Sequence, residues 1–402
     1  MREIPGAWQR TARGAGLLSP TGVPAPTIFA EMTALAVRTG AVNLGQGFPD
    51  EDGPKEVLDA AAAAIAAGEN QYAPGRGVPA LLQAVAAHQR RFYGIELDPQ
   101  REVLITAGAT EALAATLLAL IDSPDDEVVV FEPYYDSYAA CVALAGARLV
   151  TVPLRWRDFQ PDLDELAAAV SDRTRLILVN DPHNPTGAVF SAAVRNEIVR
   201  LAERHDAIVV TDEVYEHLVF EPPHVPIAKV PGAAERTLTI SSAGKTFSTT
   251  GWKIGWISGP GDLIDAVTAV KQFLTYVNGT PFQHAIAAGL ALPDAFFAGV
   301  GDALQVKRDL LGDGLRAAGF EVSVPGGSYF TVANAAHLMT SETDAADFCR
   351  ELPERAGVAA IPLTAFTTRG RRKEYATLVR FAACKRTDVI AEASRRLAAL
   401  SG

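Results

Sequence analysis

The sequence of 402 residues has few cysteines. Only three occur, Cys141, Cys349 and Cys384, and they stand far apart and outside any CxxC or Cys/His cluster. This spacing argues against a disulfide framework and against a thiolate metal site, so no metal is expected. We expect each cysteine to be a small buried apolar residue.

Long apolar runs are also missing. The most apolar stretch, Ala112 to Ile121, is about half of the roughly 20 residues that a membrane span needs. The first residues lack the apolar core of a signal peptide. These absences predict a cytoplasmic protein without a membrane partner.

The chain has no excess of basic residues. Lysine and arginine number 36 against 47 acidic residues, a formal net charge of −11, so nucleic acid is not expected to be a partner. Two nucleotide fingerprints are absent as well. The segment Gly244 to Thr246 resembles the end of a P-loop, but Thr239 stands where its first glycine is required, and no GxGxxG follows the first strand-like run. The sequence therefore favours another small-molecule ligand.

Seven short β-branched runs alternate with longer helical segments. Most of the runs are nearly all apolar and do not alternate, which is typical of strands in a sheet that helices cover on both faces. The pattern predicts one large α/β domain. The runs are Val103 to Thr106, Val128 to Phe131, Leu149 to Val152, Leu176 to Asn180, Ile208 to Thr211, Thr237 to Ser241 and Ile254 to Ser258.

The flanking segments have other patterns. Met1 to Pro26 is rich in Gly, Pro, Ala and Arg without periodicity, which predicts an irregular arm. Helices are predicted over Lys55 to Ala67, over Pro79 to Tyr93, and from Leu263 to about Ala318 with breaks near 278–281 and Pro293. Four further strands are predicted at Glu321 to Val324, Tyr329 to Ala333, Val358 to Ile361 and Leu378 to Ala382.

The length exceeds what one hydrophobic core usually supports, so at least two domains are expected. We predict an N-terminal arm and part of a small domain over 1–50, a large domain over 51–290, and a small α+β domain over 291–402.

Reactive side chains follow several of the predicted strands. They occur in the segments Gly108 to Glu111, Asn180 to Gly187, Asp212 to Tyr215 and Ser241 to Thr246. Ligands of open α/β sheets bind beyond the carboxyl ends of the strands. Five groups are therefore expected to converge at this edge of the sheet: an amide, a carboxylate, a phenol, a lysine, and a helix N-terminus, which suits a phosphate. Pyridoxal phosphate needs these groups: a Schiff-base lysine, a carboxylate against its ring nitrogen, a donor to its ring oxygen and a phosphate site.

Each group has a simpler interpretation when it is taken alone. Lys245 could be a solvated surface residue, and Asp212 could be a helix N-cap with Tyr215 in the core. Arg380 could form a salt bridge at the rim. Only the combination of groups favours the cofactor.

Longer phrases of the chain resemble a known family. From Ile28 to Leu397 the chain is similar to the fold type I, class I/II pyridoxal-phosphate aminotransferases, in the kynurenine or glutamine transaminase-like branch. Within that branch its sequence is most similar to actinobacterial N-succinyldiaminopimelate aminotransferases. The resemblance implies a seven-stranded, mostly parallel sheet in the large domain. The phrases span Asn43 to Asp50, Asn70 to Tyr72, Glu132 to Tyr138, His183 to Gly187, Asp212 to His217, Ser242 to Ser248, Thr250 to Trp256 and Val379 to Phe381.

The resemblance also implies a role for each matched residue. Lys245 forms the Schiff base and moves protons, Asp212 pairs with the ring nitrogen, Tyr215 and Asn184 bond the ring oxygen, and Tyr135 stacks on the ring. Gly108, Ala109, Thr110, Ser242, Lys253 and Tyr72 of the partner subunit hold the phosphate. Arg380, Gly47 and Asn184 bind the substrate, with Arg380 on its α-carboxylate.

The implied function is a homodimeric aminotransferase that exchanges an amino group between an L-amino acid and a 2-oxo acid by a ping-pong mechanism, with the 276–281 loop near the partner's site. Two alternatives stay open: a β-eliminating lyase of cysteine S-conjugates, or a specialised biosynthetic enzyme on the same site. A cofactor-sensing regulator is disfavoured, because about thirty irregular residues are too few for a DNA-binding domain. Asp181 and Ala383 depart from the family pattern and leave the substrate open.

Overall fold

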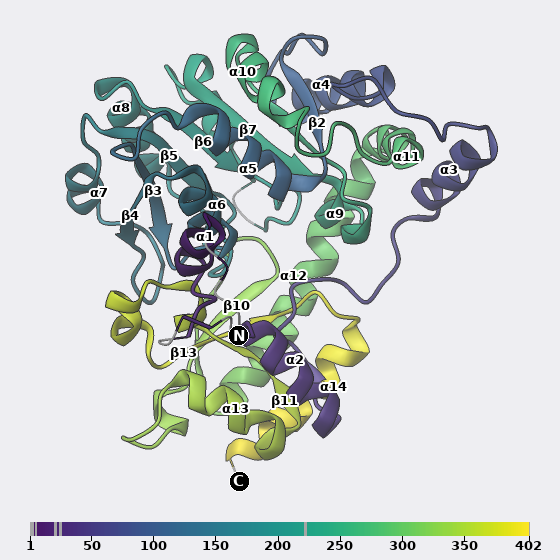
Figure 1. The fold of residues 1–402 in the computed structure, drawn as a ribbon. Helices are drawn as coiled ribbons and strands as arrows, with labels where there is room; N and C mark the ends of the chain where they lie inside the picture. Colours follow the sequence, from purple (N-terminus) through teal and green to yellow (C-terminus); the bar gives the residue numbers. More distant parts are fainter. Residues whose placement is uncertain (1–3, 5, 20–21, 24–25, 221–222, 402) are drawn as a thin grey trace.

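The computed structural model describes residues 4, 6–19, 22–23, 26–220 and 223–401, and a seven-stranded sheet forms its centre (Figure 1). The strand order is β2-β8-β7-β6-β5-β3-β4. All neighbours are parallel except β8, which is antiparallel to both β2 and β7, so the predicted mostly parallel sheet is confirmed. The strands are β2 Val103–Thr106, β3 Glu127–Glu132, β4 Arg148–Pro153, β5 Thr174–Asn180, β6 Ile208–Asp212, β7 Thr237–Ser242 and β8 Gly255–Ser258.

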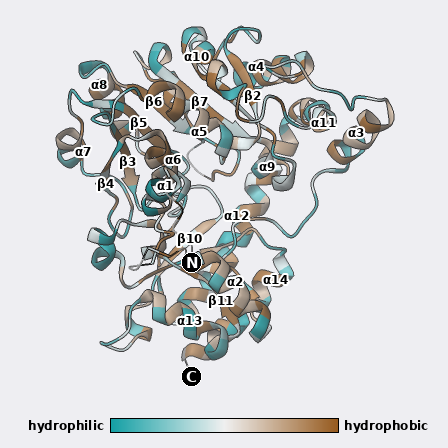
Figure 2. Ribbon diagram, in the orientation of Figure 1, coloured by the Kyte–Doolittle hydropathy of each residue, from teal (hydrophilic) through white to brown (hydrophobic). Residues whose placement is uncertain are grey.

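Helices cover both faces of this sheet. On one face lie α5 (Gly108–Leu120), α6 (Ser137–Ala145) and α10 (Gly261–Lys271), and on the other lie α7 (Leu163–Ala169) and α8 (Ala192–Arg204). Every residue of β2, β3, β7 and β8 is buried as a result. Figure 2 shows the central strands as mainly hydrophobic. Burial on both faces is the reason why residues 103–105 of β2 and 128–131 of β3 are continuous apolar runs.

Further helices pack beside the sheet. They are α3 (Lys55–Ala66), α4 (Pro79–Tyr93), α9 (Ala243–Thr246) and α11 (Thr280–Leu290), and the predicted helix over Pro79 to Tyr93 is confirmed residue for residue. The long helix α12 (Asp294–Ala317) packs mainly against the C-terminal helix Thr387–Leu397 instead. The predicted break at Pro293 is confirmed between α11 and α12, whereas the break between α10 and α11 covers 272–279 and only overlaps the one predicted near 278–281. Among the described residues, no single helix is both long and apolar enough to span a membrane; α11 and α12 meet that test only when taken together, and they bend by 92° at their junction.

A second unit combines residues from before and after the central sheet in the chain. Its antiparallel sheet has the order β12-β13-β10-β9, with β9 Glu321–Val322, β10 Phe330–Asn334, β12 Ile361–Pro362 and β13 Leu378–Ala382. A separate parallel pair joins β1 (Val42–Asn43) to β11 (Val358–Ala359). The helices of this unit are α2 (Ile28–Thr39), α13 (Ala345–Ala356) and α14 (Thr387–Leu397). The prediction of one strand over Val358 to Ile361 is wrong, because the chain passes there from one sheet to the other.

Short 3₁₀ helices complete the structure. They are η1 Ile227–Lys229, η2 Ala234–Arg236, η3 Thr250–Trp252, η4 Ala336–Leu338, η5 Leu363–Phe366, η6 Arg369–Tyr375 and η7 Ala398–Ser401.

The predicted irregular arm contains a helix, so this part of the prediction is wrong. Helix α1 (Trp8–Gly14) docks on the C-terminal end of α6, where Arg10 Nε donates to the carbonyl of Ala143 at 2.7 Å. Such a short helix is only marginally stable on its own and depends on tertiary contacts. Its seven residues are too few to show a helical periodicity in the sequence. Residues 1–3, 5, 20–21 and 24–25 of the predicted arm lie outside the described residues. The domain division at residues 50 and 290 stays a prediction.

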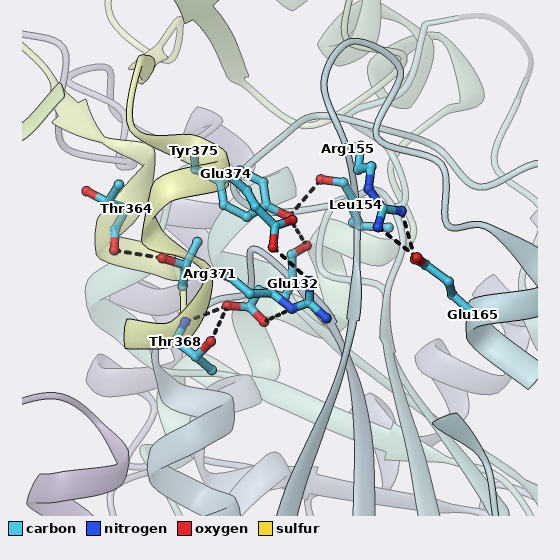
Figure 3. A network of polar contacts seen from close by, with 10 residues as sticks. Glu132, Leu154, Arg155, Glu165, Thr364, Thr368, Arg371, Glu374 and Tyr375 are labelled. Carbon is cyan, nitrogen blue, oxygen red and sulfur yellow. Dashed lines mark hydrogen bonds and ion pairs between the residues drawn. The ribbon is translucent and has the colours of Figure 1, made fainter. Parts of the chain in front are cut away.

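A buried carboxylate joins the two units. Glu132, at the end of β3, accepts hydrogen bonds from the backbone N–H and the hydroxyl of Thr368, and Arg371 Nε lies 3.5 Å from its other oxygen (Figure 3). Beside it, Tyr375 Oη shares its one proton between the carbonyls of Glu132 at 2.9 Å and Leu154 at 3.0 Å. The segment η6 is thereby tied to the ends of β3 and β4.

Candidate active site

A cavity of about 400 Å³ lies between the carboxyl edge of the central sheet and the second unit. Of the thirteen predicted site residues, twelve line it: Gly47, Gly108, Ala109, Thr110, Tyr135, Asn184, Asp212, Tyr215, Ser242, Lys245, Lys253 and Arg380. Tyr72 is the exception. Its side chain is 82% exposed, with its ring 5.6 Å from that of Tyr276.

Lys245 follows strand β7, whose last residue leads directly into α9. Its side chain is half-buried and its Nζ donates to Tyr329 Oη at 2.9 Å. Tyr329 Oη in turn donates to the carbonyl of Gly47. The lysine is therefore not a solvated surface residue.

Asp212 ends strand β6 and is 4% exposed. Tyr138 Oη donates to its Oδ2 at 2.7 Å, and Asn180 Nδ2 donates to its backbone carbonyl at 2.7 Å. Burial raises the pKa of Asp212 to about 6, although the Tyr138 hydrogen bond and the charge of Lys245 oppose the shift. Turns follow at 214–217, so Asp212 does not cap a helix.

The start of α5 forms a cradle for an anion. Gly108 begins the helix with φ +74°, and its preceding residue offers no side-chain cap to the first N–H groups. A Cβ on Gly108 would lie 3.1 Å from Lys253 Nζ. Desolvation, together with the positive charge of Lys245, lowers the pKa of Lys253. Free N–H groups and an ammonium group at a helix N-terminus suit a phosphate.

Arg380 lies on β13 in the second unit and is 2% exposed. Nη1 donates to Asn184 Oδ1 at 3.2 Å and Nη2 to the carbonyl of Gly45 at 2.8 Å, whereas Nε is buried without a partner. The guanidinium lies 4.1 Å from the ring centre of Phe330 and 4.5 Å from that of Phe366. Burial lowers its pKa to about 10. Within the described residues it forms no ion pair, so it is not a rim salt bridge.

The sequence interpretation missed three polar residues of this site. Tyr138 and Asn180 hold Asp212, and Tyr329 holds Lys245. Tyr138 stands inside one of the family phrases and Asn180 at a strand end, so both could have been found. Tyr329 was assigned only to a predicted strand, where a tyrosine is typical of a core residue.

The chain matches a known protein family over most of its length. Residues 39–397 match the family model described as aminotransferase class I and II. The chain belongs to this family. It is therefore an enzyme of the transferase class with the fold type I architecture.

Two relatives cover most of the chain. A protein of Mycobacterium tuberculosis named probable N-succinyldiaminopimelate aminotransferase DapC is 52% identical over 386 residues, which are 94% of this chain and 96% of the relative. The methionine aminotransferase of Escherichia coli is 40% identical over 85% of this chain and 88% of the relative. The solved structure of the M. tuberculosis N-succinyldiaminopimelate aminotransferase has a TM-score of 0.91 and 49% identity, and the match covers 99% of this chain and 100% of that one.

Proposed function

We propose that this aminotransferase binds pyridoxal phosphate in the cavity and exchanges an amino group between an L-amino acid and a 2-oxo acid by a ping-pong mechanism. One observation carries the proposal. A single cavity brings together an accessible lysine, a buried carboxylate, a capless helix N-terminus with a second lysine, and a buried arginine without a counter-ion. This donor set fits the aldehyde, ring nitrogen and phosphate of the cofactor and the carboxylate of a substrate.

Each cavity residue has a place in this proposal. Lys245 would hold the aldehyde of the cofactor, Asp212 its ring nitrogen, and Asn184 and Tyr215 its ring oxygen, while Tyr135 would lie against the ring. The α5 N-terminus from Gly108 to Thr110, Ser242 and Lys253 hold the phosphate. The bound cofactor acts as an electron sink that makes the substrate Cα proton acidic. Lys245 takes that proton as a general base, and the buried Asp212 keeps the ring nitrogen protonated.

The substrate carboxylate belongs at Arg380. A guanidinium offers two parallel N–H groups to a carboxylate, and burial among aromatic rings removes competing water. Gly47 lies on the same side, and a Cβ there would approach Phe330 Cζ to 2.7 Å, so a larger residue would displace the ring. Any L-amino acid with a free α-carboxylate fits this proposal.

We further propose that the enzyme is a cytoplasmic homodimer in which Tyr72 and the 276–281 loop reach the partner's cavity. Large exposed apolar side chains near these segments support an interface: Tyr72 at 82%, Phe273 at 83%, Leu274 at 46% and Tyr276 at 48% exposure. Sedimentation equilibrium of the purified enzyme tests this proposal, and a monomer at micromolar concentration would contradict it.

An amino-donor screen tests the reaction. Each L-amino acid is offered with pyruvate, 2-oxoglutarate or glyoxylate, and both the new 2-oxo acid and free ammonia are measured. Amino transfer predicts a 2-oxo acid equal in amount to the new amino acid, without ammonia. Ammonia as the main nitrogen product would instead favour the β-eliminating lyase.

Lys245 is the residue on which the proposal depends most directly. Borohydride reduction of the cofactor-loaded enzyme, followed by peptide mapping, should place the pyridoxyl group on Lys245. Lys245→Ala should retain cofactor through the phosphate and ring contacts and lose steady-state turnover by at least about 1,000-fold, because both the nucleophile and the general base are gone. A label on Lys253 or on Lys271, which is bonded to backbone carbonyls, would contradict the assignment.

A further inference from the structure

Tyr329 joins the lysine of the cavity to the Gly47 loop. Its hydroxyl lies 2.9 Å from Lys245 Nζ and also bonds the carbonyl of Gly47. A phenol has one proton, and a carbonyl can only accept. The hydroxyl therefore donates to Gly47 and accepts from Lys245, so its direction is fixed from both sides.

Surrounding contacts hold Tyr329 in place. The side chain is 3% exposed, and its backbone carbonyl accepts a hydrogen bond from the N–H of Ala383 at 2.7 Å. The ring of Tyr215 packs edge-on against it at 5.3 Å between centroids. Burial raises the pKa of Tyr329, which keeps the phenol protonated at neutral pH. The hydroxyl is thus a preorganised acceptor.

We propose that Tyr329 is a positioning residue that holds the free ε-amino group of Lys245 at the cavity. The proposal rests on the proposed function, in which Lys245 must be free during each half-reaction and must then bond the cofactor again. A lysine side chain has four rotatable bonds and searches many rotamers when it has no partner. An amine that donates to Tyr329 is kept in one place, and its lone pair points away from the tyrosine. The bond should therefore speed the return of the lysine to the cofactor aldehyde.

The same hydroxyl connects two parts of the substrate site. The loop at Gly47 lies against Tyr329 and Phe330, since a Cβ on Gly47 would be 3.2 Å from Tyr329 Cε2. Arg380 faces β10 directly, in register with Val332. Tyr329 thus places the lysine relative to the elements that are proposed to hold the substrate carboxylate.

The test uses apo-protein and Tyr329→Phe, which keeps the ring and removes the hydroxyl. Stopped-flow absorbance follows bond formation between added pyridoxal phosphate and Lys245, and we expect the rate constant to fall about tenfold. Pyridoxamine phosphate has no aldehyde and cannot bond the lysine, so its dissociation constant should stay within about twofold and report an intact cavity. In turnover, kcat should fall while the KM of the amino acid changes less.

Tyr375→Phe is the matched control. Its buried hydroxyl also forms hydrogen bonds to backbone carbonyls, but it does not line the cavity. This variant should lose stability and keep the wild-type rate of bond formation. An unchanged rate in Tyr329→Phe, or an equal drop in Tyr375→Phe, would overturn the positioning role. Failure of wild-type protein to bond pyridoxal phosphate at Lys245 would instead overturn the proposed function.

Discussion

Two charged side chains of the cavity, Asp212 and Arg380, are buried without a carboxylate or guanidinium partner among the described residues. Burial of an unpaired charge costs several kcal/mol, and the protein shows that cost as shifted pKa values. The pKa of Asp212 rises to about 6 and that of Arg380 falls to about 10. A protonated ring nitrogen and a substrate carboxylate would each remove one of these costs, so the charges favour ligand binding over apo-protein stability.

Asp212→Asn tests this cost in the apo-protein. The pKa of Asp212 is higher in the folded protein than in the unfolded chain. Its contribution to the free energy of unfolding is therefore favourable at low pH, where the carboxyl is protonated, and is lost as pH rises from about 4 to about 6. Two pKa units correspond to about 3 kcal/mol. Urea unfolding should therefore show apo wild type losing up to about 3 kcal/mol relative to apo Asp212→Asn across this window.

The comparison between the two proteins isolates Asp212. Asp181, whose pKa is also raised to about 6 by burial, contributes equally to both proteins and cancels. Added pyridoxal phosphate should stabilise the wild type more than the variant above pH 6, since only the carboxylate pairs with the ring nitrogen. A difference in unfolding free energy that does not change with pH would contradict the argument.

Arg380→Lys tests the proposed site for the substrate carboxylate. A lysine cannot reproduce the two-bond fork, and one lost charged hydrogen bond is worth about 1.5–3 kcal/mol. The KM values of the amino acid and of the 2-oxo acid should therefore both rise about 10- to 100-fold, with an unchanged absorbance spectrum of the bound cofactor. Arg386→Lys, at an exposed pair with Asp388, is the control and should leave both KM values unchanged. Unchanged KM values in Arg380→Lys would mean that another cation binds the substrate.

At the scale of elements, sequence patterns predicted best where burial is uniform. Strands β2 and β3 are buried at every residue, so their apolar runs were visible, and α4 has a proline at its start and a glycine at its C-cap. The passage of the chain from one sheet to another after β11 and the docking of α1 on α6 both depend on partners far away in the sequence. A local sequence pattern cannot predict such contacts. Tyr329 was missed for the same reason, because its role depends on Lys245 and Gly47, residues 84 and 282 positions away.

Gly14→Val tests whether α1 is held by close packing on α6. A Cβ on Gly14 would approach Ala143 Cβ to 2.5 Å and the carbonyl of Ala139 to 2.9 Å, so the added side chain should force α1 away. Chymotrypsin cleavage after Trp8 should then become at least about tenfold faster, because the helix is released. The thermal midpoint should change by less than about 2 °C, since α1 buries no residue fully. Arg13→Ala, on the exposed side of α1, should leave cleavage unchanged.

At the scale of the whole molecule, the cavity depends on how the two units are joined. Lys245 and Asp212 belong to the central sheet, whereas Arg380 and Tyr329 belong to the second unit. The Glu132 contact is a polar link between them, in which the carboxylate is fully buried and its partners Thr368 and Arg371 are partly exposed. A neutral or misdirected group at this position should disturb the substrate site more than the cofactor site, because the residues of the same chain that are proposed to hold the cofactor all lie between 108 and 253 in the central unit.

Glu132→Gln tests this link with almost no change in shape. The carboxylate accepts from both donors of Thr368 and faces Arg371, whereas an amide would turn an N–H group toward one of these donors. A buried donor without an acceptor costs about 1–3 kcal/mol, so the free energy of unfolding should fall by that amount. The KM of the amino acid should rise several-fold, while the dissociation constant of pyridoxamine phosphate should change by less than about twofold. Glu165→Gln is the matched control, since Glu165 pairs with Arg155 at the nearby surface and should cost less than about 1 kcal/mol (Figure 3). If cofactor affinity fell as much as substrate affinity, Glu132 would support the central sheet itself rather than the position of the second unit.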